Sequence, residues 1–432
     1  MAKIDDSVKK KVPELRFKGF TDDWEERKLG DTETHFTDGN YGESYPSAKD
    51  MSDKANGIPF LRGSDFSNGY LDSSNANYIK PEKHAELTSG HIKQDDIVIA
   101  VRGSLGTLGY ATKENEGWNI NSQLAILRTN KSEISGMFLI QYLLGSKGQK
   151  EIFSRNTGTA LKQLPIKQLK DIPVPVPTLL EQQKIGSFFK QLDNTIALHQ
   201  RKLDLLKEQK KGYLQKMFPK NGAKVPELRF AGFADDWEER KLGDTETHFT
   251  DGNYGESYPS AKDMSDKANG IPFLRGSDFS NGYLDSSNAN YIKPEKHAEL
   301  TSGHIKQDDI VIAVRGSLGT LGYATKENEG WNINSQLAIL RTNKSEISGM
   351  FLIQYLLGSK GQKEIFSRNT GTALKQLPIK QLKDIPVPVP TLLEQQKIGS
   401  FFKQLDNTIA LHQRKLDLLK EQKKGFLQKM FV

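Results

Sequence analysis

The side chains best suited to chemistry in this sequence lie in polar loops that are interleaved with glycines and aromatic rings. Five such loops occur in the first half of the chain: Asp38–Tyr45, Arg62–Asp65, Arg102–Ser104, Asn121–Gln123 and Arg155–Gln163. Arg, Lys, Asn and Gln side chains can pair bidentately with purine edges in a major groove. Ser, Thr, Lys and the backbone N–H groups of glycine turns can hold phosphates. The loops predict contacts with a nucleic acid, and solvated turns without a ligand are the alternative.

The residues that catalysis would need are missing from the sequence. The chain has no G-x-x-x-x-G-K-[ST] phosphate loop, no H-E-x-x-H metal motif and no Asn/Asp-Pro-Pro-aromatic tetrapeptide typical of amino-methyltransferases. Gly103–Gly109 follows an expected strand, but its glycine spacing does not match a nucleotide loop. We expect Asp95 and Asp96 to be solvated acids at the start of a strand, and His84 and His91 to be isolated surface histidines. No metal site is therefore predicted, and a reader of nucleic acid is favoured over an enzyme.

Nearly the whole sequence is one segment written twice. Residues 11–218 reappear as 224–431, shifted by 213, and only three positions differ: Lys18/Ala231, Thr21/Ala234 and Tyr213/Phe426. A repeat of this length is the size of a domain, not of a solenoid unit. Because the copies are almost identical, both must fold and bind alike, which suits a target that is itself two-fold symmetric.

The candidate DNA-binding residues come from the five loops and their copies. They are Asn40, Tyr41, Tyr45, Arg62, Ser64, Arg102, Ser104, Asn121, Gln123, Arg155, Thr157, Thr159, Lys162, Gln163, Asn253, Tyr254, Tyr258, Arg275, Ser277, Arg315, Ser317, Asn334, Gln336, Arg368, Thr370, Thr372, Lys375 and Gln376.

Composition limits the class of protein. At 432 residues the chain can bury two sizeable cores. No apolar run approaches membrane-spanning length and the N-terminal residues lack a signal-peptide core, so we expect a cytoplasmic protein without a membrane partner. The absence of cysteine excludes disulfides, Cys-zinc sites and thiol catalysis.

The distribution of charge is more informative than the net charge of +7. Residues 31–180 carry 16 Lys/Arg against 17 Asp/Glu, whereas residues 181–218 carry 8 against 4. A protein that holds DNA unaided usually shows a stronger basic field. If DNA is the ligand, another protein must supply much of the phosphate contact.

Each repeat begins with a turn-rich body. Residues 24–30 predict a short helix stopped by Gly30. Short β-like runs follow at 58–61, 96–101 and 124–127, with Asn68-Gly69 as a hairpin-turn signal. Residues 138–144 predict a helix. The expected class is α+β, with many short loops.

The body ends in a proline-rich stem and a long helix. Ile172-Pro173-Val174-Pro175-Val176-Pro177 can be neither helix interior nor central strand and predicts an extended, polyproline-like segment. Thr178 and Glu181 form a capping box. From there an a/d heptad seam continues through the next residues without a break. A helix over residues 181–218 would be roughly 57 Å long at 1.5 Å per residue.

The apolar seam residues, with their copies, are Ile185, Phe189, Leu192, Ile196, Leu203, Leu206, Ile398, Phe402, Leu405, Ile409, Leu416 and Leu419. The same seam includes polar residues at His199, Lys210, His412 and Lys423, and we expect them to help fix its register.

Each helix alone would expose an apolar stripe, and the other helix is the simplest cover. The sequence therefore predicts two globular α/β domains separated by two long antiparallel helices that form a coiled coil, with pseudo-two-fold symmetry. The alternative is that each helix packs only on its own domain. The expected boundaries are a tail at 1–12, a first domain at 13–177, a first helix at 178–218, a linker at 219–225, a second domain at 226–390 and a second helix at 391–432.

Several segments resemble one protein family. The stem and helix at 169–215 resemble the conserved-helix region of the specificity subunits of type I restriction-modification enzymes. Upstream, residues 57–65, 95–106 and 157–160 resemble the target recognition domains of that family. The resemblance covers nearly the whole chain and occurs twice.

The resemblance implies a non-catalytic subunit that reads double-stranded DNA with two target recognition domains. Two modification subunits would bind it and use S-adenosylmethionine to methylate adenine N6, with the base flipped out. Restriction subunits with a motor would join them and cut unmodified DNA with ATP and Mg²⁺. The chain itself would bind no cofactor.

One feature departs from the family pattern. Members usually carry two different recognition domains and read an asymmetric bipartite site, whereas residues 31–212 and 244–425 are identical here. A palindromic bipartite target is therefore expected. A stand-alone sequence-specific DNA-binding protein and a two-domain interaction scaffold for other ligands are the alternatives.

Overall fold

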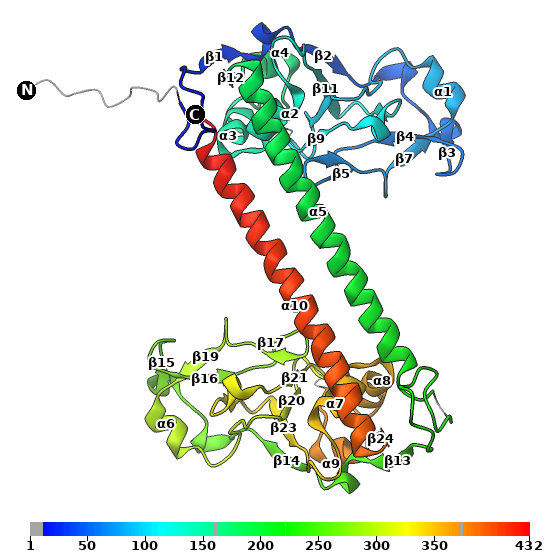
Figure 1. Ribbon diagram of the computed structural model, residues 1–432, viewed down its shortest axis with the longest axis vertical. Coiled ribbons are helices and arrows are strands. Elements are labelled where there is room, and N and C mark those ends of the chain that lie inside the picture. The colour runs from blue at the N-terminus through cyan, green and yellow to red at the C-terminus, as the bar shows by residue number, and fades with distance from the viewer. Residues whose placement is uncertain (1–11, 159–161, 221, 372–374) are drawn as a thin grey trace, which may run out of the picture. The chain divides into compact units, whose positions relative to one another are not determined.

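The computed structural model describes residues 12–158, 162–220, 222–371 and 375–432 (Figure 1). The chain forms two compact units. The first consists of the residues up to Gln200 together with Arg414–Val432, and the second consists of Arg201–Gln413. Each unit holds one globular body and one segment from each of the two long helices.

The first body and its helix contain the strands β1 Glu25–Lys28, β2 His35–Asp38, β3 Met51–Ser52, β4 Ile58–Leu61, β5 Phe66–Ser67, β6 Tyr70–Leu71, β7 Asn77–Ile79, β8 Ile97–Ala100, β9 Leu108–Tyr110, β10 Asn119–Ile120, β11 Leu124–Arg128 and β12 Pro173–Val176, and the helices α1 Pro81–Glu86, α2 Gly136–Leu144, α3 Ser146–Ser154, α4 Ile166–Lys170 and α5 Leu179–Lys216.

The second set repeats the first in the same order. Its strands are β13 Glu238–Lys241, β14 His248–Asp251, β15 Met264–Ser265, β16 Ile271–Leu274, β17 Phe279–Ser280, β18 Tyr283–Leu284, β19 Asn290–Ile292, β20 Ile310–Ala313, β21 Leu321–Tyr323, β22 Asn332–Ile333, β23 Leu337–Arg341 and β24 Pro386–Val389, and its helices are α6 Pro294–Glu299, α7 Gly349–Leu357, α8 Ser359–Ser367, α9 Ile379–Lys383 and α10 Leu392–Lys429.

A six-stranded mixed sheet is the centre of each body. In the first unit its order is β2-β11-β8-β9-β6-β5, and a four-stranded sheet of order β10-β4-β7-β3 lies beside it. Side chains alternate along β8, as the pleat of a strand requires. Ile97 and Ile99 pack with α2, whereas Val98 and Ala100 pack with Leu61 on the other side of the sheet. The sheet is therefore buried on both faces.

The three strands and the helix expected from the apolar runs are present as β4, β8, β11 and α2. The hairpin turn is confirmed too, because β5 pairs antiparallel with β6 across Asn68 and Gly69. Both turn residues have positive φ, 53° and 83°. That is the geometry of the tight hairpin turns that favour Asn-Gly.

The prediction of a helix over residues 24–30 is wrong. Glu25–Lys28 is the strand β1, and a single 3-10 turn, Leu29–Thr32, follows it. The reason is a distant partner, because β1 pairs antiparallel with β12, with Arg27 opposite Val174. The proline-rich stem is this second strand of a two-stranded sheet, which agrees with its exclusion from helix interiors and central strands.

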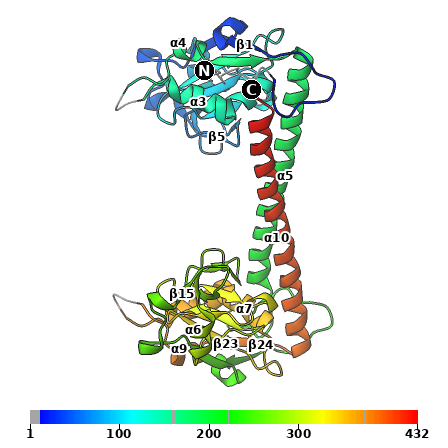
Figure 2. The same cartoon turned by 90° about the vertical axis from the view of Figure 1, so that its left-hand side faces the viewer.

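The long helices α5 and α10 pack against each other in both units (Figures 1 and 2). In the first unit the Phe188 and Phe426 rings lie 5.1 Å apart, and Asp193 pairs with Lys423. Residue numbers rise along α5 in the direction in which they fall along α10, so the pair is antiparallel. The apolar seam residues are buried or half-buried throughout, which confirms the heptad pattern and rules out helices that pack only on their own bodies.

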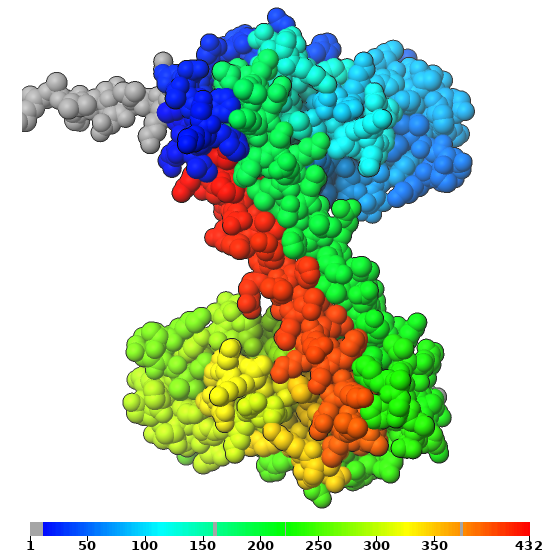
Figure 3. All heavy atoms as spheres, viewed as in Figure 1, coloured from blue at the N-terminus to red at the C-terminus, as the bar shows by residue number. Residues whose placement is uncertain are grey.

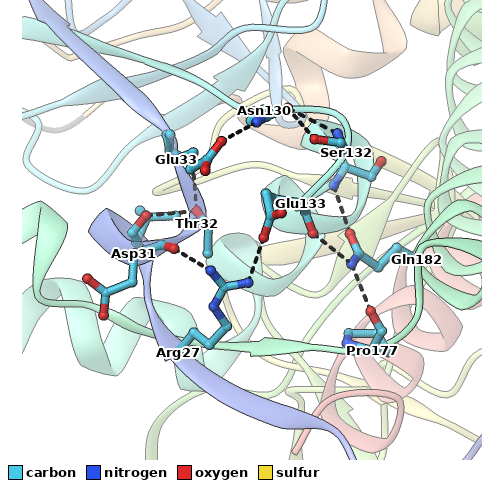
Figure 4. Close-up of polar contacts among 12 residues, drawn as sticks. Arg27, Asp31, Thr32, Glu33, Asn130, Ser132, Glu133, Pro177 and Gln182 are labelled. Atoms are coloured by element: carbon cyan, nitrogen blue, oxygen red, sulfur yellow. Dashed lines mark hydrogen bonds and ion pairs between the residues drawn. The ribbon is translucent and has the colours of Figure 1, made fainter.

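Figure 4 shows polar contacts that hold the start of α5 on the first body. The buried Gln182 amide donates to the carbonyl oxygens of Pro177 at 2.8 Å and Glu133 at 3.3 Å, and its oxygen accepts from Ser135 N at 2.7 Å. Arg27 of β1 donates to Glu133 Oε2 at 2.7 Å. The helix is therefore tied to both the strand pair and the loop before α2.

The C-terminal residues complete the core of the first unit. Phe431 packs against Trp24, Phe138 and Phe189, and Lys429 O accepts a hydrogen bond from Leu15 N at 2.9 Å. Figure 3 shows the red C-terminal residues against the dark-blue segment that leads into β1. Phe218 occupies the equivalent place in the second core. In the part of the chain that the structure describes, no helix is long and apolar enough to cross a membrane.

Candidate nucleic-acid interface

Arg102 lies at the meeting point of the polar loops in the first body. Its guanidinium donates to Gln163 Oε1 at 3.2 Å, to the Tyr41 hydroxyl at 3.3 Å and to Ser122 O at 3.3 Å. It also lies over the Tyr41 ring, 5.3 Å from the centroid. One side chain thus joins four of the five loops that the sequence singles out.

The loops are also in direct backbone contact. A Cβ on Gly39 would lie 2.1 Å from Asn121 O, so only glycine fits where the 38–45 loop crosses the 121–123 loop. The Gln123 carbonyl accepts hydrogen bonds from the N–H groups of Val101 and Arg102 at 2.8 and 3.2 Å. The Arg62–Asp65 loop lies close to the 102–104 loop, since a Cβ added at Gly63 would lie 3.3 Å from the Ser104 Cβ. All five loops therefore form one continuous surface.

The loop between α3 and α4 reaches this surface through a short ladder. Thr157 and Gln163 exchange two backbone hydrogen bonds of 2.8 and 2.9 Å, and Gln163 bridges on to Arg102. Lys162 is exposed and has no ion-pair or hydrogen-bond partner among the described residues. Thr159, and its copy Thr372, lie outside those residues. Arg155 is held by Glu151, with which it forms an ion pair one turn earlier on α3.

The candidate residues differ in how accessible their polar groups are. Tyr41, Tyr45, Ser64, Ser104, Gln123 and Thr157 are exposed, whereas Asn40 and Asn121 are buried. The Asn40 amide donates to Ser89 O at 2.8 Å, and Asn121 holds Gln123 through both its amide and its carbonyl. The buried pair orders the loops, and the exposed set can reach a ligand.

Arg62 is already engaged by its own loop. Its guanidinium donates to both oxygens of Asp65 at 3.2 Å and to Asn75 O. The Asp65 side chain is almost fully buried, whereas that of Arg62 is 37% exposed. Arg62 therefore stiffens the loop and presents only part of its guanidinium to solvent.

Local electrostatics keep the Tyr41 hydroxyl protonated, and the nearby Asp38 carboxyl partly balances the positive charge of Arg102. Burial and the nearby Asp38 raise the pKa of the Tyr41 hydroxyl, so it remains a donor, and it donates to Ser122 O at 3.1 Å. Burial raises the pKa of Asp38, against the opposing effect of Arg102. The arrangement holds a guanidinium, a hydroxyl and an aromatic ring in fixed relative positions.

The second body repeats this arrangement with nearly the same distances. Arg315 donates to Gln376 Oε1 at 3.1 Å and to Tyr254 OH and Ser335 O at 3.4 Å, and it lies 5.3 Å from the Tyr254 centroid. The other copies keep their roles: Asn253, Tyr258, Arg275, Ser277, Ser317, Asn334, Gln336, Arg368, Thr370 and Lys375.

Phe153 is an exposed aromatic at this surface that the loop pattern does not reveal. It is 49% exposed, near the end of α3, and its ring lies 3.3 Å from where a Cβ on Gly106 would be. Its copy Phe366 is exposed to the same extent. The sequence offers one signal, because Ile152 and Phe153 are adjacent apolar residues and adjacent side chains on a helix point in different directions. Since Ile152 faces the core, the Phe153 ring must point elsewhere.

Two expectations about titratable residues are wrong. Asp96 is buried and forms a fork with Arg128, with contacts of 2.7 and 2.8 Å, because it directly precedes β8, a central strand of the sheet. His84 and His91 are not isolated, since their ring centroids lie 4.6 Å apart and both are half-buried. Burial and His91 lower the pKa of His84. The residues that the structure describes hold no cluster of three or more His, Cys, Asp or Glu side chains that could bind a metal.

Comparisons with known proteins point to one family. The model of the type I restriction modification DNA specificity domain matches residues 21–208 and again residues 234–421. A Methanocaldococcus jannaschii protein, provisionally named the type I restriction enzyme MjaX specificity subunit, is 27% identical over 94% of this chain and 92% of its own length. The EcoBI specificity subunit of Escherichia coli is 22% identical over 84% of this chain and 78% of its own.

A solved structure shares the fold. The crystal structure of the type I restriction-modification system S subunit from M. genitalium covers 98% of this chain and 99% of its own, with a TM-score of 0.66 at 16% identity. Two matches to the family domain fill most of the chain, and each includes most of a long helix that packs on the other long helix. The chain therefore belongs to the type I restriction-modification specificity subunits, the non-catalytic subunits that confer DNA specificity on their complexes.

Proposed function

We propose that each body reads double-stranded DNA with the surface centred on Arg102, or on Arg315 in the second copy. The observation that carries this proposal is the meeting of four loops around one oriented guanidinium, with the fifth loop in contact with Ser104. An arginine fork can pair with O6 and N7 of a guanine. The exposed Gln123, Thr157 and Lys162 around it offer further contacts to bases and phosphates.

The DNA target that fits two identical bodies contains the same short base sequence twice. In an inverted repeat this sequence occurs once on each strand, so each body binds an equivalent half-site. The half-sites should lie about one helical turn apart, roughly 10 bp centre to centre, with an unread spacer between them. Each half-site should hold one adenine to be methylated.

The chemistry belongs to partner subunits that bind S-adenosylmethionine, ATP and Mg²⁺. Two modification subunits would bind this chain and methylate adenine N6, and restriction subunits would cut unmodified DNA in the cytoplasm. The nearly neutral body supports this division, since a reader with 16 basic and 17 acidic residues over 31–180 needs other proteins to neutralise phosphates. The family membership supports it too.

The test of the function is co-purification with candidate modification subunits, followed by methylome sequencing of DNA exposed to the complex. We expect adenine-N6 methylation of one bipartite motif whose halves are reverse complements. A motif with unrelated halves would contradict equivalent use of the two bodies. Methyl transfer by the isolated chain would contradict its role as a reader.

The placement of the surface is tested by paired substitutions. Arg102→Ala with Arg315→Ala should weaken specific binding by about 1–3 kcal/mol per half-site and relax the motif, whereas Lys162→Ala with Lys375→Ala should weaken binding to all sequences alike. Lys28→Ala with Lys241→Ala is the charge-matched control, because those lysines lie on β1 and β13 and pair with Asp171 and Asp384. Unchanged binding in both loop variants would move the reading surface elsewhere.

A further inference from the structure

Two buried ion pairs join the long helices, one in each unit. In the first unit Lys423 Nζ of α10 lies 2.6 Å from Asp193 Oδ1 of α5. In the second unit Lys210 Nζ of α5 lies 2.6 Å from Asp406 Oδ1 of α10. The aspartate side chains are 8% exposed and the lysines 15–16%. The two pairs involve the same two repeat positions with the helices exchanged.

Burial makes these charges costly unless they are paired. Burial raises the pKa of Asp193, and Lys423 opposes the rise. In the second unit the Tyr283 hydroxyl also donates to Asp406 Oδ2 at 3.4 Å. A protein is often no less stable when apolar residues replace a buried ion pair. Such a pair is therefore best explained by the alternative helix pairings that it excludes.

The apolar seam alone cannot choose among the possible helix pairings. Its residues recur every seven positions and are the same in both helices apart from Tyr213/Phe426. The charged positions break this degeneracy. In a parallel pairing, Asp193 would face Asp406, and Lys210 would face Lys423. A slip of one heptad in the antiparallel pairing would place Asp193 against Leu416 or Met430.

Each alternative buries charge without compensation. Two like charges a few ångströms apart repel strongly where water is excluded, and a lone carboxylate among apolar side chains loses its hydration. Only the antiparallel pairing seen in each unit gives both acids a base. The same charges thus disfavour a wrong direction and a wrong register.

We propose that Asp193–Lys423 and Lys210–Asp406 form a pairing code that selects the partner, direction and register of the long helices. The code is self-complementary, since each helix carries one acid and one base. Its partner is any helix that presents the same acid and base in the opposite direction, including the helices of a second copy of this chain. This inference does not depend on the proposed DNA target.

The test uses full-length variants that rewrite the code. The all-lysine variant is Asp193→Lys with Asp406→Lys, and the all-aspartate variant is Lys210→Asp with Lys423→Asp. A third variant combines all four substitutions and so reverses every pair. Molecular mass by light scattering and helix melting by circular dichroism are measured for each variant and for an equimolar mixture of the first two.

The four-fold variant should keep the mass and melting of the parent chain, because each pair is only reversed. Alone, the all-lysine and all-aspartate variants should lose the cooperative melting of the helix pair. Mixed, they should form a 1:1 complex of twice the parent chain's mass with melting restored, since each lysine finds an aspartate on the other chain. A purely structural role would not give this rescue.

The exposed pair Lys28–Asp171 provides the control, because its side chains are 61% and 41% exposed. Lys28→Asp should change neither mass nor melting, alone or in mixtures. The code is refuted if either double variant melts like the parent, or if the mixture gives no complex. Failure of the four-fold variant to fold also refutes it, since the code treats both orientations of a pair as equivalent.

Discussion

Arg102 is held in position by neighbours that need no ligand to do so. The Tyr41 hydroxyl accepts from its guanidinium and donates to Ser122 O, and the Tyr41 ring lies beneath it. Tyr41→Phe with Tyr254→Phe keeps the ring and removes the hydroxyl. We expect DNA affinity, measured by fluorescence anisotropy, to fall by about 1 kcal/mol per half-site with unchanged stability. Tyr213→Phe, on α5 and matched by Phe426 in the second copy, should leave affinity nearly unchanged, and an equal loss in this variant would contradict this role for Tyr41.

Tyr70 links single-residue chemistry to stability at high pH. Burial, and then Asp193, raise the pKa of Tyr70 to about 12. An unfolded tyrosine titrates near pH 10. Because the folded pKa is the higher one, the stabilisation is complete below about pH 10 and is lost as pH rises towards 12.

Tyr70→Phe with Tyr283→Phe should therefore flatten the fall in unfolding free energy between pH 10 and 12, by about 1 kcal/mol per residue. The measurement is urea unfolding at a series of pH values. Tyr45→Phe, at an exposed ring that packs edge-on against Phe60 at 5.7 Å, is the control. If the unfolding free energy of the Tyr70 variant falls as steeply between pH 10 and 12 as that of the parent chain, the Tyr70 phenol does not control the loss of stability at high pH.

At the scale of elements, Glu181 fastens the first turn of α5 to the body. Its carboxylate is fully buried and accepts from Arg16 at 2.7 and 2.9 Å and from the Trp24 indole at 3.2 Å. Glu181→Ala leaves a buried guanidinium and an indole N–H unpaired. We expect a loss of about 3–5 kcal/mol in the free energy of unfolding of the first unit.

Two comparisons sharpen the Glu181 test. Asp171→Asn breaks an exposed ion pair with Lys28 and should cost well under about 1 kcal/mol. Glu394→Ala should reproduce the Glu181 effect, because Arg229 and Trp237 bind Glu394 in the same way. Urea denaturation of the three variants distinguishes a buried anchor from a surface pair, and equal small losses in all three would contradict the anchor.

Elements with a strong local pattern could be predicted from the sequence, and elements defined by distant partners could not. The heptad seam and the β8 run carry their own periodicity, so their burial follows from the residues alone. Residues 25–28 have the composition of a helix turn but form β1 because β12 lies about 150 residues away. In the same way, the five loops could be chosen by composition. The meeting of four of them at Arg102 depends on a sheet order of β2-β11-β8-β9-β6-β5 that no local signal specifies.

At the scale of the whole molecule, the core of each unit is completed by a segment that belongs to the other repeat in the sequence. The core of the first unit includes Met430 and Phe431, and that of the second includes Met217 and Phe218. Residues 414–431 and 201–218 are identical except for Phe426 and Tyr213. Either segment could therefore complete either body.

A single repeat should accordingly assemble with itself. We expect residues 1–219 to form a homodimer in which the end of α5 from each copy covers the body of the other, as residues 414–432 cover the first body here. The dimer should have twice the mass of one repeat by light scattering, and its unfolding should depend on protein concentration. Residues 1–200 alone would expose Trp24 and Phe189, which Phe431 covers, and should not dimerise. A stable monomer of residues 1–219 would show that each body needs no second helix, and the argument from the shared cores would fail.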